Sequence, residues 1–151
     1  MLDDLDRRLL RHLQADPSLS SADLAERCGI PSATCWRRIE KLEASGIIQG
    51  QEAVIDWTTL GYAVEVSLRF TLDKTQPRAF DDFLAAAREV PEVLEIQTFL
   101  GRVDVRLSVV ARDMRHYRQI YRDRILTLPH IADIEALMHI TRLKQDQRLP
   151  L

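Results

Sequence analysis

The first 45 residues of the chain carry apolar side chains at the spacing of three helices. Asp16–Pro17 predicts where the first helix ends, because the residue before a proline is disfavoured in the α conformation. Ser20 or Ser21 can cap the second helix, and Gly29 supplies its stop. The three apolar stripes are Leu5, Leu9, Leu10 and Leu13, then Leu24, Ala25 and Cys28, and then Cys35, Ile39 and Leu42.

The third helix, which we expect to begin with Ser32 as its N-cap, gathers cations on the side away from its apolar stripe. A short helix, a glycine turn and a second, cationic helix are the layout of a helix-turn-helix, whose second helix enters the DNA major groove. The alternative to DNA binding is an ordinary solvent-exposed helix face in which the cations pair with Glu40 and Glu43. We expect Trp36 to be half-buried in a packing role. The residues expected to contact DNA are Ser32, Thr34, Arg37, Arg38 and Lys41.

Beyond this helix the pattern changes at Gly46. Residues 47–55 predict a small β-hairpin, the wing of a winged helix-turn-helix. We therefore expect a DNA-binding domain over residues 1–55, a linker over residues 56–61 and a second domain over residues 62–151.

The second domain alternates between strand and helix periodicity. Residues 64–70 alternate apolar and polar positions, and residues 77–90 form a helix in which we expect Phe80, Leu84 and Ala87 to face one side. Asp113 caps a second helix that ends before Pro129. Further strands are predicted over residues 93–99, 103–110 and 131–140.

This order, βαββαβ, predicts an α+β fold: a ferredoxin-like sandwich with a four-stranded antiparallel sheet and helices on one face. The other face of such a sheet is bare unless a second copy covers it, which predicts a homodimer. A dimer would also present two recognition helices to one operator.

Composition limits the possible functions. Hydrophobic residues make up 46% of the 151 residues and charged residues 29%, as in a globular protein with a core. The net charge of -2 argues against a purely electrostatic DNA binder, so affinity would depend on local clustering of cations. No apolar run is long enough to span a membrane, and the acidic start of the chain is unlike a signal peptide, which predicts a cytoplasmic protein. Cys28 and Cys35 match no metal-binding pattern, so we expect reduced core thiols, with no metal and no cofactor.

The chain as a whole resembles the Lrp/AsnC, or feast/famine, family of transcription regulators. The resemblance rests on the order and spacing of five segments, since each alone is weak. The variant of residues 34–38 and the ending of residues 149–151 resemble the branch that includes a cysteine-responsive activator. The five segments are residues 2–10, 24–30, 37–48, 101–104 and 109–114.

The resemblance implies a regulator whose assembly and DNA affinity respond to an amino acid or a similar small molecule, bound between dimers that often reach octamers. The family's effector loop maps onto Gly101 and Asp104, where an aspartate can pair with an α-ammonium. Without the resemblance, an ordinary hairpin turn with a solvated Asp104 would be the better interpretation. Residues 134–138 offer none of the hydroxyls that the family's last strand commonly carries, which puts a standard amino-acid pocket in doubt. The implied effector residues are Gly101, Arg102, Asp104 and Ala136.

Two other functions remain open. Haem-dependent siroheme decarboxylases resemble the same two-part architecture, but residues 91–99 contain no histidine and the four histidines are scattered, so we expect no enzyme. The second alternative is a metabolite-binding module that has lost DNA binding. It would fit the lack of net positive charge in residues 1–50, which hold seven Lys or Arg and eight Asp or Glu.

Overall fold

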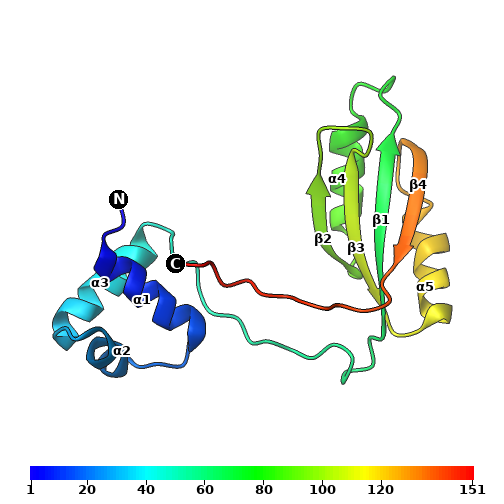
Figure 1. The fold of residues 1–151 in the computed structure, drawn as a ribbon. Coiled ribbons are helices and arrows are strands. Elements are labelled where there is room, and N and C mark those ends of the chain that lie inside the picture. Colours follow the sequence, from blue (N-terminus) through cyan, green and yellow to red (C-terminus); the bar gives the residue numbers. More distant parts are fainter. The chain divides into compact units, whose positions relative to one another are not determined.

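The computed structural model describes all 151 residues, which form two compact units (Figure 1). The first unit comprises Met1–Val54 together with Lys144–Leu151, and the second comprises Ile55–Leu143. This division differs from the expected one, in which residues 144–151 belonged to the second domain and residues 56–61 formed a linker. No helix is long and apolar enough to cross a membrane.

Each of the first two helices begins at a side-chain cap. Asp3 accepts the N–H of Asp6 at 2.8 Å and the carboxylate of Asp6 accepts the N–H of Asp3 at 3.2 Å, which is a capping box. Ser20 caps the second helix by accepting the N–H of Asp23 at 3.1 Å, and Gly29 ends it at φ 65°. That positive φ favours glycine, because other residues are strained there. The helices of this unit are α1 (Asp4–Ala15), α2 (Ser21–Cys28) and α3 (Ser32–Ala44).

Two local predictions for this unit are wrong. Pro31 rather than Ser32 is the N-cap of α3, and no side chain caps that helix; proline suits the position because its φ is already fixed near the helical value. Residues 47–55 form no hairpin and run without strand pairing. The core agrees with the predicted stripes; its buried members are Leu9, Leu24, Ala25, Cys28 and Cys35.

The last residues of the chain bind α1. The N–H of Leu149 donates to the side-chain oxygen of Gln14 at 2.7 Å, and the Gln14 amide donates back to the Leu149 carbonyl at 3.3 Å. Arg11 Nε donates to the main-chain oxygen of Leu151 at 2.7 Å. Polar side chains on one face of α1 thus hold the tail against the first unit.

The second unit has the predicted βαββαβ order, with all strand pairs antiparallel and the strand order β2-β3-β1-β4. In the view of Figure 1, α4 lies behind the sheet. The elements are β1 (Val64–Leu72), α4 (Ala79–Arg88), β2 (Val93–Thr98), β3 (Val105–Ala111), α5 (Met114–Ile120), η1 (Tyr121–Ile125, a π-helical turn that continues α5) and β4 (Ile131–Met138).

Alternate residues of the two central strands form the core between the sheet and the helices. Phe70 of β1 and Phe83 of α4 are fully buried, with ring centroids 4.9 Å apart. The buried stripe of α4 is therefore Ala79, Phe83 and Ala87, and the predicted stripe is corrected because Phe80 is exposed. The buried strand residues are Val66, Leu68, Phe70 and Leu72 on β1 and Val105, Leu107, Val109 and Ala111 on β3.

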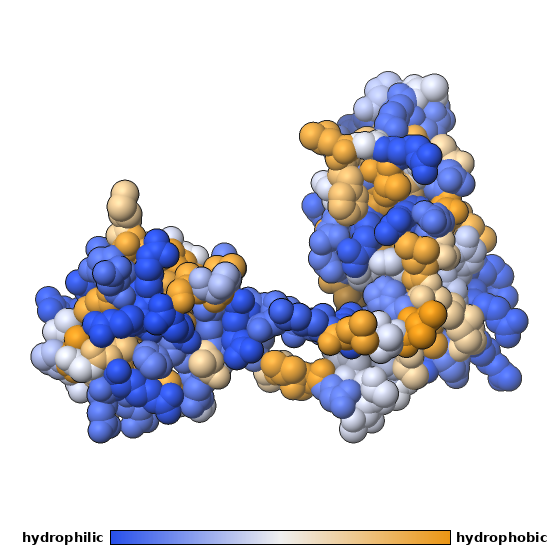
Figure 2. Space-filling model, viewed as in Figure 1, coloured by the Kyte–Doolittle hydropathy of each residue, from blue (hydrophilic) through white to orange (hydrophobic).

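The opposite face of the sheet is mostly polar. Arg106 of β3 donates to Ser67 at 2.9 Å, to Gln97 at 2.9 Å and to Ser108 at 3.1 Å. Figure 2 shows hydrophilic and hydrophobic residues mixed over the second unit and over the segments that leave it. Exposed apolar side chains of these segments are Val54, Ile55, Trp57, Leu60, Ile140 and Leu143.

Candidate DNA-binding face and effector sites

The exposed side of α3 gathers most of the residues expected to contact DNA. Cys35 and Leu42 point into the core, so residues about half a turn away around the helix face outward. Arg37 and Lys41 are exposed on that side, Thr34 is half-buried at its edge, and Ser32 is exposed in the first turn of the helix. We name the exposed residues Ser32, Ala33, Trp36, Arg37, Glu40 and Lys41 the α3 face.

Trp36 was expected to be half-buried, and 56% of its surface is exposed. It follows Cys35 by one residue and therefore projects about a quarter turn away from the core stripe. An exposed tryptophan beside Arg37 and Lys41 adds apolar area to an otherwise polar face. From the sequence, this residue was given a packing role and was not included among the residues expected to contact DNA.

Arg38 is not free on the α3 face. Its guanidinium donates to Asp3 at 2.5 Å and to Asp6 at 3.0 Å, and Asp6 is buried. The N–H of Asp6 and then Arg38 lower the pKa of Asp3, and the two carboxylates raise the pKa of Arg38. Arg38 therefore ties α3 to the capped start of α1, a contact between residues 35 positions apart that the sequence did not reveal.

The two cysteines are buried, free thiols in the core of the first unit. Burial, and to a smaller extent Cys28, raises the pKa of the Cys35 thiol. A buried thiol with a raised pKa is unreactive, which fits a packing role. No group of three or more His, Cys, Asp or Glu side chains is arranged to hold a metal ion.

The predicted effector loop connects β2 to β3 and is closed by the Phe99 N–H, which donates to the Asp104 carbonyl at 2.9 Å. Gly101 has φ 155°, and both Gly101 and Arg102 are exposed. The hydroxyl of Thr71 donates to the carbonyl of Arg102 at 3.0 Å. The loop is therefore held to the end of β1 and presents Gly101 and Arg102 outward.

Asp104 lies inside the loop rather than at its surface, with only 3% of its area exposed. Its carboxylate accepts the N–H of Leu72 at 2.9 Å and Lys74 Nζ at 3.1 Å. Within this chain it therefore braces the loop against β1. The alternative interpretation, a solvated turn residue, is wrong, because Asp104 is buried.

Ala136 is separated from this loop within the sheet. It pairs with Leu68 of β1, which pairs on its other side with Leu107 of β3. Two strand spacings, roughly 10 Å, therefore lie between Ala136 and β3. One chain by itself does not bring Ala136 together with Gly101 and Arg102.

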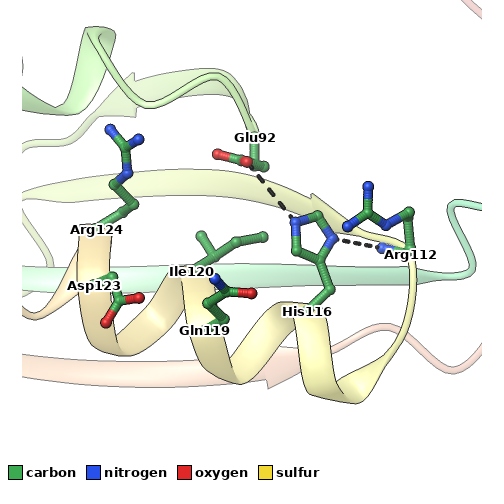
Figure 3. A pocket seen from close by; sticks show the side chains of 7 residues that line it. All are labelled: Glu92, Arg112, His116, Gln119, Ile120, Asp123 and Arg124. Carbon is green, nitrogen blue, oxygen red and sulfur yellow. Dashed lines mark hydrogen bonds and ion pairs between the residues drawn. The ribbon is translucent and has the colours of Figure 1, made fainter.

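A cavity of about 230 Å³ lies at the other end of the β2–β3 hairpin from this loop (Figure 3). His116 was expected on an exposed helix face, but it is half-buried in the cavity wall. The wall is charged on several sides, and its residues had not been singled out together, because they come from separate elements. Positions 116, 120 and 124 do share one helix face, which was the available signal. The lining residues are Glu92, Arg112, His116, Gln119, Ile120, Asp123 and Arg124.

Comparison with known proteins agrees with this two-part organisation. Residues 2–49 match the profile of a winged helix-turn-helix DNA-binding domain, and residues 65–149 match that of the Lrp/AsnC ligand-binding domain. The missing hairpin at residues 47–55 is thus a local departure within a recognised domain class.

Individual relatives cover nearly the whole chain. The leucine-responsive regulatory protein of Salmonella typhimurium is 32% identical over 98% of this chain and 90% of that protein. The DNA-binding transcriptional activator DecR of Escherichia coli (strain K12) is 32% identical over 100% of this chain and 99% of its own length. A transcriptional regulator from Neisseria meningitidis, solved as a complex with L-Met, has a TM-score of 0.91 at 26% identity and covers 99% of this chain and 97% of that one. These relatives are regulators and give the decarboxylase hypothesis no support. This chain belongs to the Lrp/AsnC family of transcription regulators.

Proposed function

We propose that this regulator binds operator DNA through the α3 face and changes its DNA affinity when its second unit binds an amino acid. The observation that carries the proposal is the outward-facing pair Arg37 and Lys41 on the second helix of a helix-turn-helix, in one chain with a ligand-binding domain. A non-enzymatic role follows, because both units are then used for binding.

At the DNA, Arg37 and Lys41 would contact phosphates or base edges, while Ser32 and Thr34 near the helix start would approach the groove. Trp36 would add an apolar contact, of the kind that reads a thymine methyl. Arg38 would act as a positioning residue, because its ion pairs with Asp3 and Asp6 fix the orientation of α3.

In the second unit, Gly101 and Arg102 are the proposed effector residues of the loop, and Asp104 would hold that loop in place. Ala136 would reach a ligand at this loop only if a second copy supplied it. This supports a homodimer and a further assembly of dimers, as does the Arg106 guanidinium, which has three neutral acceptors and no carboxylate partner on the outer sheet face.

The test is fluorescence anisotropy with DNA from upstream of the gene, with and without each free amino acid, combined with light scattering for the size of the assembly. We expect salt-sensitive, saturable binding that at least one amino acid shifts several-fold. If the protein binds this DNA no better than random DNA, with or without amino acids, the proposal is wrong. The result would then favour the alternative of a metabolite-binding protein that has lost DNA binding.

A further inference from the structure

We propose that the cavity between the start of β2, the end of β3 and the helix α5–η1 is a second small-molecule site, which takes a free amino acid as a zwitterion. It is separate from the loop of residues 99–104, because Glu92 precedes β2 and Arg112 follows β3, at the opposite end of the hairpin (Figure 1). Its regulatory meaning rests on the proposed function, whereas the binding itself does not.

Glu92 supplies an unsatisfied charge to the cavity. Its Oε2 is shielded from solvent and accepts no hydrogen bond, and its Oε1 lies 3.9 Å from His116 Nε2, beyond hydrogen-bond reach. Buried polar atoms almost always have a partner, and one without a partner in the protein calls for an explanation, such as a water, an ion or a ligand. A ligand ammonium at this position would satisfy the carboxylate.

His116 is fixed in an orientation that presents a hydrogen-bond donor to the cavity. The N–H of Arg112 donates to His116 Nδ1 at 3.2 Å, so the proton of the neutral ring lies on Nε2, which faces Glu92 (Figure 3). Asp113 caps α5 by accepting the N–H of His116 at 2.7 Å, which holds the backbone of this residue. The Nε2 N–H is therefore available as a neutral donor beside the unsatisfied carboxylate.

Two cations flank the same space. In Figure 3, Arg112 and Arg124 lie on opposite sides of His116 and Ile120. Neither guanidinium has a carboxylate within ion-pair distance, whereas Asp123 is already bound by Arg122 at 2.7 Å and 3.3 Å. A ligand carboxylate can therefore be held by arginine through charge-assisted hydrogen bonds.

The mixture of charges selects the class of ligand. A simple anion would meet Glu92 and Asp123, and a simple cation would meet Arg112 and Arg124. A zwitterion matches both signs at once. The volume of about 230 Å³ suits a single free amino acid rather than a nucleotide or a peptide.

The experiment is isothermal titration calorimetry of the full chain with L-methionine, L-leucine, L-cysteine, L-glutamate and L-arginine. We expect at least one to bind, with its Kd raised about tenfold or more by Glu92→Gln and by Arg124→Gln. Glu89→Gln, at the exposed end of α4 and outside the cavity, is the matched control and should leave the Kd unchanged. The N-acetyl and amide derivatives of the best ligand each lack one charge and should bind at least tenfold more weakly.

Several results would overturn the proposal. They are no binding by any of the five amino acids, equal binding by wild type and both cavity variants, or equal binding by the derivatives. Loss of binding in Gly101→Val but not in Glu92→Gln would assign the ligand to the loop instead. Operator binding by the ligand-free cavity variants tests the proposed function separately, because neither Glu92 nor Arg124 belongs to the α3 face. Thermal unfolding checks that both variants fold.

Discussion

The two units differ in how their functional residues are held. On the first unit, Arg37 and Lys41 point outward from a helix whose opposite face is core, and nothing else in the unit binds them. In the second unit, Asp104 is buried and bonded to Leu72 and Lys74 of another segment. A DNA-reading face needs only a rigid helix with free side chains, whereas a small-molecule site needs groups from several elements that brace one another.

The strongest way to test this contrast is to remove the free cations of the first unit. Arg37→Ala combined with Lys41→Ala should weaken operator binding about 100-fold, because up to two phosphate or base contacts are lost on each protomer. The slope of log K against log salt should fall by about one unit for each phosphate contact removed. Anisotropy titrations across salt concentrations measure both quantities, and circular dichroism should show an unchanged fold.

The matched control is Arg88→Ala combined with Arg118→Ala, which removes the same charge from exposed helix positions of the second unit. These changes should leave operator affinity nearly unchanged. An equal loss of affinity in both double variants would mean that net charge, not the α3 face, governs binding.

The second unit is expected to respond in its stability. Asp104→Ala leaves the buried N–H of Leu72 without an acceptor, which costs about 1–3 kcal/mol of unfolding free energy. Asp104→Asn keeps an acceptor but loses the ion pair with Lys74, so its effect should be smaller. Urea denaturation of both variants measures the difference.

Asp133→Ala, at an exposed position on β4, is the control and should unfold like the wild type. If Asp104→Ala were as stable as the wild type yet lost its response to amino acids, Asp104 would be a ligand-binding residue and the contrast between the units would disappear.

Features that arise from the period of a single element could be predicted from the sequence. The three helical stripes, a serine cap at position 20 or 21, the stop at Gly29 and the βαββαβ order were all available from spacing and from residue type. These features depend on neighbours within about a turn or a strand, so a linear sequence contains them.

Contacts between distant segments were not available in this way. Arg38 meets Asp3, and Asp104 meets Leu72, across 35 and 32 residues, and no local pattern distinguishes these side chains from free ones. The cavity has the same origin, since Glu92 and Arg124 become neighbours only after the sheet and the helix have packed. Resemblance to a family suggested an effector loop at residues 101–104, but it did not reveal that the loop's aspartate is buried.

Trp36 tests whether the α3 face reads sequence as well as charge. Trp36→Ala should weaken operator binding roughly tenfold, at the low end of the discrimination of a base contact, and leave binding to random DNA nearly unchanged. Trp36→Phe should keep part of the affinity, because a smaller aromatic ring can still contact a thymine methyl. Parallel titrations with operator and random duplexes measure the ratio, and an equal loss on both would indicate packing rather than base contact.

Substitution of Arg38 should have the smallest effect on operator binding. Among the residues of the first unit expected to contact DNA, Arg38 is the one held by ion pairs to another segment, as Asp104 is in the second unit. Arg38→Gln should lower the midpoint of thermal unfolding by a few degrees, since buried Asp6 loses its cation, and weaken operator binding only as far as α3 loses its orientation.

The folded-state pKa of Asp3 lies below its ordinary value of 3.8, so the contribution of this ion pair is present above about pH 4 and is lost as the pH falls through the lowered pKa. The wild type and Arg38→Gln should therefore differ in stability at pH 7 and approach each other as the pH falls through the lowered pKa of Asp3, whereas Arg8→Ala, an exposed cation on α1, should follow the wild type at every pH. The slope of log K against log salt for operator binding should change less in Arg38→Gln than in Lys41→Ala. An equal reduction in both variants would show that Arg38 leaves Asp3 and Asp6 to contact DNA, and Arg38 would then not be a positioning residue.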